Sequence, residues 1–349
     1  MKVFLFMVTL WLVATASLAL SIKTRELPLA ERFTISRKTW DASVNVFVAV
    51  TYDGLTGVGE ASPNDRWGET PESVVAQLEA VDVGSLKGPF DLEGPTELLP
   101  AGAARSALDI AMHDLAARRA GIGLSELLGL AGGSRPATSV TIPISDRERM
   151  IERARSLADH PALKLKVGFE EDVDVVRAVR SVYTGRIRVD ANEGWEPDDA
   201  IDRLEKLALL DIELCEQPIP AGRLKDLHEV TKNSPIPVFA DEDACTAEDV
   251  ADLAGAVDGV NLKLRKTGGV REFMRAAAVA RAHDMKLMIG CDLESGVAIT
   301  AGAHVAVLVD FADLDGPLLL KNDPYPGVTY TKGTMTLPDG LGLGMEVSL

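Results

Sequence analysis

The sequence is poor in cysteine, and the number it has argues against a disulfide framework. Among 349 residues there are three, Cys215, Cys245 and Cys291. They are odd in number, and each lies beside the end of an apparent strand, which does not suit a set of cross-links. We therefore expect reduced thiols that serve the packing of the fold.

The sequence also lacks an excess of positive charge. Lysine and arginine number 36 against 53 aspartates and glutamates, which gives a formal net charge of −17. Binding to phosphates requires charge of the opposite sign, so we expect no nucleic acid partner. The acidity is instead expected to favour solubility.

One apolar run is present, at residues 1–16 (MKVFLFMVTLWLVATA), and it is too short for a comfortable membrane span. It has one basic residue and ends in Ala14, Thr15 and Ala16, which fit a cleavage site. Three interpretations stay open: an export signal, an extension without function or from a wrongly assigned start codon, and an uncleaved anchor. Export would place the protein in the periplasm, and its absence would leave the protein in the cytoplasm. No stable membrane span is expected after processing.

Residues 17–133 have the pattern of a small α+β domain. Two strand patterns, SLALSIKTREL and NVFVAVTYDGLTGVGEA, flank a polar segment, TISRKTWDAS, and the second strand pattern contains a hairpin turn at Asp53 and Gly54. A second polar segment, SPNDRWGETPES, follows, and helical patterns cover about 72–82 and 96–119. We expect a domain that caps a larger one, with residues 321–349 folding back to complete it.

From residue 134 the pattern changes to strand followed by helix, repeated eight times up to residue 320. Hydrophobic residues make up 46% of the chain, enough for a large core. Eight such units predict a (β/α)8 barrel of the TIM type. The chain is long enough for this barrel together with the smaller domain.

Charged residues end five consecutive strands of this barrel. The strands are ALKLKVG, RIRVDAN, IELCEQP, PVFADED and GVNLKLRK. Their charges recur roughly every 22 to 26 residues, the length of one strand, one helix and two loops. A charge in a buried strand costs several kcal/mol, so its repetition indicates a shared polar centre at the C-terminal ends of the strands.

Three acids, Asp190, Glu216 and Asp241, end three neighbouring strands. Adjacent strands lie about 4.8 Å apart, so the carboxylates can converge and repel each other. A hard divalent cation would relieve that repulsion, and an all-oxygen set without histidine or cysteine favours Mg²⁺, or Mn²⁺, over zinc. The alternative is that each acid pairs with a basic residue. Further acids and amides beside them could support the site: Asn192, Glu193, Glu242 and Asp243.

Lys166 and Lys263 are placed to act as acid and base. Lys164 and Lys166 are two apart in a strand and share one face. Lys263 ends the sixth strand, on the opposite side of an eight-stranded barrel from Lys166, with the acids between them. A carbon acid held there would have an amine on each side, which suits removal of a proton from one face and its return to the other. Alternatively, the lysines extend to solvent; Lys266 is expected in a loop or helix start.

These motifs resemble the enolase superfamily, in its muconate-lactonising-enzyme-like subgroup. The barrel motifs are K-x-K, D-x-N, E-Q-P, A-D-E and N-x-K-x-x-K-x-G-G. The D-L-D-G of the eighth strand, with LPAGAARSALDIAMHDLAARRAG and DRWGET, is similar to the dipeptide epimerases that act on L-Ala-D/L-Glu.

The resemblance implies a role for each matching position. Asp190, Glu216 and Asp241 would bind Mg²⁺, and Lys166 and Lys263 would be the acid and base groups. Asp313 and Asp315 would bind the α-ammonium of a dipeptide, and capping of the next helix or loop is the alternative for them. Lys164, Glu294 and Arg66 are further candidates for substrate contact.

Substrate specificity is less well defined by the motifs. Asp292, Asp243 and Arg265 stand where the family usually has other residue types, and Asp292 could favour a polar or cationic second residue over glutamate. The two polar segments of the first domain are expected to be loops that close over the barrel. Their cations Arg37, Lys38 and Arg66 are candidates to bind a substrate carboxylate, or ordinary surface residues.

The sequence therefore predicts an isomerase, an Mg²⁺-dependent dipeptide epimerase of murein peptide metabolism. It would interconvert epimers at the α-carbon of the C-terminal residue by two-base 1,1-proton transfer through an enediolate. The alternatives are an N-acylamino acid racemase, an o-succinylbenzoate synthase or a cycloisomerase and, more remotely, a barrel that binds without catalysis. The partner is a small dipeptide, and a homo-oligomer is compatible with the sequence.

Overall fold

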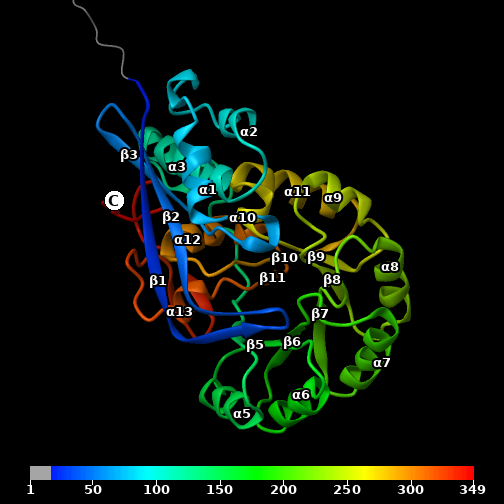
Figure 1. Cartoon of the computed structure of the whole chain (residues 1–349). Coiled ribbons are helices and arrows are strands. Elements are labelled where there is room, and N and C mark those ends of the chain that lie inside the picture. The colour runs from blue at the N-terminus through cyan, green and yellow to red at the C-terminus, as the bar shows by residue number, and fades with distance from the viewer. Residues whose placement is uncertain (1–16) are drawn as a thin grey trace, which may run out of the picture.

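The computed structural model describes residues 17–349, and the proposed leader, residues 1–16, lies outside the described residues. An antiparallel sheet and its helices lie beside a curled parallel sheet that is surrounded by helices (Figure 1). None of the helices between residues 17 and 349 is long and apolar enough to cross a membrane.

The first sheet contains three antiparallel strands in the order β1-β2-β3. They are β1 (Ala19–Ile35), β2 (Lys38–Tyr52) and β3 (Leu55–Ala61). The turn expected at Asp53 and Gly54 joins β2 to β3, and both residues have positive φ angles, 50° and 78°. This conformation is open to glycine and tolerated by aspartate.

The polar segment TISRKTWDAS is not the loop between strands that the sequence suggested. Most of it continues β1 and β2 as a hairpin, in which Phe33 pairs with Trp40 and Ile35 pairs with Lys38. Its polar residues occupy both faces of the ribbon, since Thr39 and Asp41 are exposed while Ser36 and Arg37 donate to Asn192 on the barrel. Alternation is therefore weak in the sequence although the backbone pairing persists. The hairpin tip, residues 32–44, extends over the barrel (Figure 1).

Six helices between residues 65 and 127 complete the N-terminal part. They are η1 (Asp65–Trp67), α1 (Pro71–Glu79), η2 (Val83–Ser85), α2 (Gly94–Leu98), α3 (Ala103–Ala120) and α4 (Leu124–Leu127). The helix expected over 96–119 is in fact two, because Pro100 follows α2 and Gly102 adopts a φ of 140° before α3 begins. Proline excludes an N–H donor, and that φ is open only to glycine.

The parallel sheet contains eight strands in chain order, from β4 to β11. The strands are β4 (Val140–Ile142), β5 (Ala162–Lys166), β6 (Arg186–Asp190), β7 (Ile212–Glu216), β8 (Val238–Ala240), β9 (Gly259–Leu262), β10 (Lys286–Ile289) and β11 (Phe311–Ala312). A parallel bridge between Thr138 and Ala312 joins the two ends and closes the barrel. The eight strand–helix units expected from the sequence are therefore confirmed.

Helices follow the strands and cover the outside of the barrel (Figure 1). They are α5 (Arg147–Ser156), α6 (Asp172–Arg180), α7 (Pro197–Ala208), α8 (Leu224–Asn233), α9 (Ala247–Asp252), α10 (Leu264–Thr267), α11 (Val270–Ala282), α12 (Gly296–Val305), η3 (Ala306–Leu308) and α13 (Gly316–Leu319). Valine, leucine and alanine on their inner faces join the strand residues in one continuous core.

The C-terminal residues lie against the N-terminal part of the chain. A small hairpin, β12 (Thr329–Thr331) and β13 (Thr334–Thr336), is followed by a tail. The N–H of Lys321 donates to Pro28, and the N–H of Leu124 donates to Gly342. These backbone bonds join segments that lie more than 200 residues apart in the sequence.

Buried carboxylates connect the N-terminal part to the barrel. Glu60, on β3, accepts from the N–H groups of Ser295 and Ala298 at the start of α12. Asp109, on α3, accepts from the N–H of Val270 at the start of α11. Helix N-termini carry unpaired N–H groups and partial positive charge, so a carboxylate there is stabilising. The two parts are thereby held in one fixed arrangement.

The contact of β3 with α3 gives a test of this packing. An added Cβ at Gly59 would lie 1.9 Å from the carbonyl oxygen of Ala107, which is a backbone atom and cannot turn away. We expect Gly59→Ala to lower the free energy of unfolding by about 1–3 kcal/mol, measured by urea denaturation. The matched control is Gly123→Ala, whose Cβ would meet only an ordinary contact at 3.6 Å. Equal stability of the two variants would contradict the tight contact.

Candidate active site

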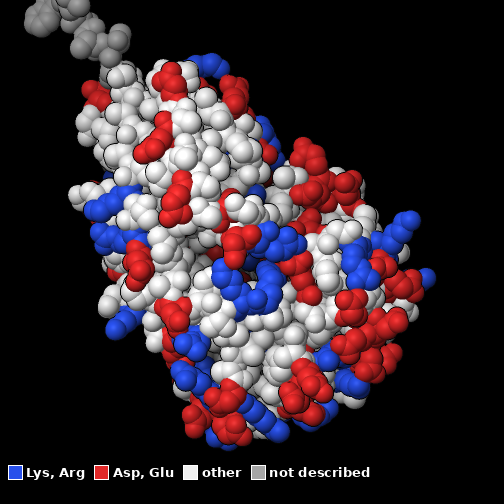
Figure 2. Space-filling model, in the orientation of Figure 1, with Lys and Arg blue, Asp and Glu red and all other residues white. Residues whose placement is uncertain are grey.

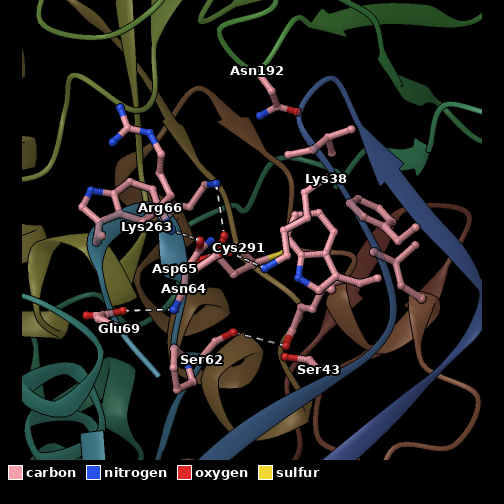
Figure 3. Close-up of a pocket in the computed structure, with 18 of the residues that line it drawn as sticks. Lys38, Ser43, Ser62, Asn64, Asp65, Arg66, Glu69, Asn192, Lys263 and Cys291 are labelled. Carbon is pink, nitrogen blue, oxygen red and sulfur yellow. Dashed lines mark hydrogen bonds and ion pairs between the residues drawn. The ribbon is translucent and has the colours of Figure 1, made fainter. Parts of the chain in front are cut away.

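A cavity of about 480 Å³ lies at the C-terminal ends of the barrel strands. The β1–β2 hairpin tip and residues 62–71 form its other walls, so both halves of the chain contribute (Figure 3). Basic side chains gather near the centre of this face of the molecule, with acidic side chains over the surrounding helices (Figure 2). The volume suits a small-molecule ligand.

The three acids expected to converge do stand side by side. Asp190 ends β6 and pairs in register with Glu216, which ends β7, and Asp241 directly follows β8. All three are at most 1% exposed. Burial, together with the negative charge of Asp190, raises the pKa of Glu216 to about 8. Negative charge is thus crowded at this row, and a cation there would be stabilising.

The lysines lie along the same row. The Nζ of Lys164 is 2.8 Å from Glu216 Oε2 and 3.1 Å from Asp190 Oδ2, so its ammonium group bridges two of the acids. The Nζ of Lys166 lies 2.6 Å from Asp190 Oδ2, and the Nζ of Lys263 lies 3.0 Å from Asp241 Oδ2. Lys166 and Lys263 therefore stand at opposite ends of the row of acids, and both line the cavity.

The protonation of these lysines depends on their partners. Burial disfavours the charged form of Lys263, but Asp241 and Asp292 outweigh burial and hold its pKa well above the ordinary value. The same holds for Lys164, where burial is outweighed by Asp190, Asp313 and Glu216. The acid partners therefore favour the ammonium form of both side chains in this arrangement. The alternative that the lysines extend to solvent does not hold, because Lys164, Lys166 and Lys263 are all buried.

Lys266 has a larger role than the sequence suggested. It lies in the short helix α10 and is 2% exposed. Its Nζ is 2.5 Å from Asp241 Oδ1 and 3.0 Å from the carbonyl oxygen of Asn261, to which it donates. The spacing K-x-x-K, with a strand end followed by one helical turn, was the signal that could have placed Lys266 beside the acids.

The acids fit a hard divalent cation in their chemistry, although they are paired with lysines here. Among residues 17–349, no three histidine, cysteine, aspartate or glutamate side chains are spaced to hold a metal ion as they stand. The Lys164 ammonium instead occupies the position between Asp190 and Glu216 as a cationic stand-in. Glu216 Oε2 and Asp241 Oδ2 are buried and accept no hydrogen bond of good geometry. Buried carboxylate oxygens without a directed hydrogen bond are suitable ligands for a hard divalent cation, whose binding would require the lysine side chains to turn away.

Two further acids line the cavity beside the row. Asp313 follows β11 and accepts from Ser139 Oγ at 2.6 Å and from Lys164 Nζ at 2.7 Å. Asp315 accepts from the N–H of Thr141 at 2.6 Å. Burial and the nearby Asp313 raise the pKa of Asp315 to about 6. Two buried carboxylates facing one cavity are suited to a cationic group on a ligand.

Glu294 does not line the cavity, contrary to its expected contact with substrate. Its carboxylate is 5% exposed and accepts from the N–H of Asp292 at 3.3 Å, so it is turned back into the loop after β10. Burial and the charge of Asp292 raise the pKa of Glu294 to about 8. A loop carboxylate of this kind could not be assigned a direction from sequence.

Arg66 is on the cavity wall, as expected, but it is already paired. Its guanidinium makes two hydrogen bonds with Glu193, of 2.9 and 2.8 Å. Arg37 lies 2.7 Å from Glu242 Oε1. Lys38, labelled with Asp65 in Figure 3, lies 2.6 Å from Asp65 Oδ2. The polar segments of the first domain do reach the barrel mouth, where these pairs connect them.

One cluster was not recognised in the sequence as a unit. Arg265 is 1% exposed, and its guanidinium lies 4.0 Å from the centre of the Trp67 ring. It also lies 3.3 Å from Glu69 and 3.1 Å from Asp292. The unusual residues at positions 265 and 292 therefore compensate each other. Trp67 and Glu69, which contact Arg265, are almost 200 residues away from it in the chain, so local sequence patterns carry no signal for the cluster.

Comparison with known proteins places this site in a family. The family described as "Enolase C-terminal domain-like" matches residues 148–349, and the N-terminal domain of the mandelate racemase/muconate lactonizing enzyme family matches residues 19–129. An L-Ala-D/L-Glu epimerase from Bacteroides thetaiotaomicron is 38% identical over 92% of this chain and 85% of its own. A hydrophobic dipeptide epimerase from Roseobacter litoralis is 38% identical over 87% of this chain and 91% of its own.

A solved structure extends the similarity to the whole fold. The dipeptide epimerase from Enterococcus faecalis, in complex with Mg and the dipeptide L-Leu-L-Tyr, superposes with a TM-score of 0.91 and 31% identity. The match covers 95% of this chain and all of the other. Since the similarity spans both halves at more than 30% identity, this chain belongs to the dipeptide epimerase family of the enolase superfamily.

Proposed function

We propose that this protein is an Mg²⁺-dependent dipeptide epimerase that inverts the α-carbon of the C-terminal residue of a dipeptide. The observation that carries the proposal is the position of Lys166 and Lys263 at the two ends of one row of buried carboxylates, lining one cavity. An α-carbon held over the row has a nitrogen on each side. Inversion needs this arrangement, because the proton must leave one face and arrive at the other.

The two lysines would exchange roles between epimers. For one epimer, Lys166 begins as the free amine and removes the α-proton at its Nζ, while Lys263 begins as the ammonium and donates a proton to the opposite face. The electron pair of the broken C–H bond passes into the substrate carboxylate, which becomes an enediolate, and then returns to carbon. For the other epimer the starting protonation states are reversed. No group is oxidised or reduced, and the enzyme returns to a starting state after proton exchange with solvent.

Asp190, Glu216 and Asp241 are the residues that would hold Mg²⁺. When bound, Mg²⁺ supplies positive charge that stabilises the negative charge developing on the substrate carboxylate. Asn261 supports the set, since its amide donates to Glu216 Oε1 at 2.8 Å. The side-chain oxygen of Gln217 helps to position Asp241 by accepting from the backbone N–H of Asp241 at 2.9 Å.

Asp313 and Asp315 would bind the α-ammonium of the dipeptide. Their carboxylates are 4% and 2% exposed and line the same cavity as the lysines. Binding at this end would hold the amino terminus of the substrate at β11 and its carboxylate at the acids of β6 to β8. The length of a dipeptide would then be recognised at both ends.

Replacement of single lysines tests the two-base mechanism. We expect Lys166→Met and Lys263→Met each to lower epimerisation at least about 100-fold, because general acid–base catalysis contributes that much or more. Each variant keeps a nitrogen on one side, so each should still exchange the α-proton of one epimer with D₂O, and the two variants should favour opposite epimers. Mass spectrometry of both epimers measures this. Exchange of both epimers by either variant would contradict the mechanism.

Removal of divalent metal tests the assignment of the acids. We expect EDTA to abolish α-proton exchange and Mg²⁺ to restore it. Mg²⁺ should also raise the midpoint of thermal unfolding of the chelated protein, because a ligand that binds only the folded state stabilises it. Asp190→Asn serves as the control and should lose this rise. Full activity in metal-free buffer would refute the Mg²⁺ requirement.

Blocking of the substrate amine separates this function from that of sister enzymes. We expect N-acetylation of a good dipeptide substrate to raise KM at least about tenfold, since it removes the charge that Asp313 and Asp315 would bind. Asp315→Asn should raise KM for the free dipeptide and have little effect with the acetylated one. Better turnover of the acetylated compound would instead favour an N-acylamino acid racemase.

A further inference from the structure

The cationic side chains on the cavity wall outside the lysine row are all paired with acids of the protein. Arg66 makes two hydrogen bonds with Glu193, and Arg37 contacts both Glu193, at 3.2 Å, and Glu242, at 2.7 Å. Lys38 lies 2.6 Å from Asp65. A carboxylate on a substrate side chain would have to displace one of these acids. These residues therefore do not supply free positive charge for glutamate.

The acids of the wall are likewise compensated. Asp292 lies 3.1 Å from Arg265 and 3.6 Å from Lys263, and Glu69 lies 3.3 Å from Arg265. Asp313 and Asp315 remain, and the proposed function uses both for the α-ammonium. Within residues 17–349, a cationic substrate side chain would therefore find no free acid on the wall outside that pair.

The wall beside Lys166 is aromatic. The ring centre of Phe33 lies 6.0 Å from Lys166 Nζ, and the rings of Phe33 and Trp40 are 6.3 Å apart. Both residues belong to the β1–β2 hairpin tip and line the cavity. Other apolar side chains continue the wall: Ile35, Val44, Leu293 and Leu319. A carbon within reach of Lys166 would present its side chain to this surface.

We propose that the protein selects dipeptides whose C-terminal residue is large and uncharged, such as phenylalanine or leucine, over those that end in glutamate or lysine. The inference rests on the proposed dipeptide epimerase function and defines its substrate class. An apolar substrate side chain would be stabilised by contact with the Phe33 and Trp40 rings, because both surfaces are then removed from water. A charged side chain loses hydration there and gains no free partner in return.

A panel of dipeptides in D₂O tests the preference with the unmodified protein and Mg²⁺. L-Ala-L-Phe, L-Ala-L-Leu, L-Ala-L-Glu and L-Ala-L-Lys are compared by α-deuterium incorporation. We expect kcat/KM for Phe or Leu to exceed that for Glu and Lys at least about tenfold. An equal or higher value for Glu or Lys overturns this inference and leaves the epimerase function standing. Exchange with no dipeptide overturns the epimerase function and this inference with it.

A variant tests whether the ion pairs cause the discrimination. Glu193→Gln removes the shared partner of Arg37 and Arg66, while the amide oxygen can still accept from the N–H of Ala221. We expect the ratio of kcat/KM for L-Ala-L-Glu over L-Ala-L-Phe to rise at least about fivefold, because a freed guanidinium can bind carboxylate. The matched control is Glu196→Gln, whose acid pairs with Arg223 outside the cavity and should leave the ratio unchanged.

A second variant tests the contribution of the apolar wall to substrate selection. Trp40→Ala should lower kcat/KM for L-Ala-L-Phe more than for L-Ala-L-Glu, since it removes apolar wall and leaves the pairs of Arg37 and Arg66 with Glu193 in place. Of the paired cations, Lys38 loses its contact with the Trp40 ring at 4.9 Å. Thermal unfolding of each variant verifies that it is folded. An unchanged ratio in both Glu193→Gln and Trp40→Ala would overturn the role assigned to these residues.

Discussion

Burial of opposite charges in one row at the mouth of the barrel is the constraint that the rest of the site depends on. Each ion removed from water costs several kcal/mol, and the cost is offset only where partners are close and well oriented. Asp190, Glu216 and Asp241 meet this condition through Lys164, Lys166, Lys263 and Lys266. The parallel strands make the row possible, because their register places each C-terminal residue beside the next.

The N-terminal part completes the cavity through contacts of the same kind. Glu60 and Asp109 accept hydrogen bonds from the starts of α12 and α11, so the sheet and α3 are fixed to the barrel. The hairpin tip then reaches across to the barrel, where Arg37 pairs with Glu242. Attachment through α11 and α12 and ion pairs at the hairpin tip give the cavity a defined aromatic wall beside the row of acids and lysines. Under the proposed function, the first part of the chain would contact the substrate side chain, and the barrel would carry the chemistry and bind the α-ammonium.

Much of the fold followed from sequence because the strand–helix period is local. Each unit of the barrel contains its own alternation, helix pattern and turn, so eight units could be recognised one by one. The errors were also local in origin. The single helix expected over 96–119 ignored the effect of Pro100 and Gly102, and the polar hairpin tip was taken for a loop because its alternation is weak. In both places the prediction followed the pattern of apolar residues and did not consider the backbone conformation.

The sequence alone determined that Asp190, Glu216 and Asp241 stand side by side with Lys166 and Lys263, since a residue at a strand end in a parallel barrel has its neighbours fixed by the period of the chain. It also determined the family, through motifs that these strand ends carry. Only the tertiary structure decided which partners the remaining charged side chains have. Arg66 pairs with Glu193 across 127 positions, and Arg37 pairs with Glu242 across 205. Such pairs depend on how two parts of the chain dock, and no local pattern encodes docking, so a cation that looked free in sequence proved to be already bound.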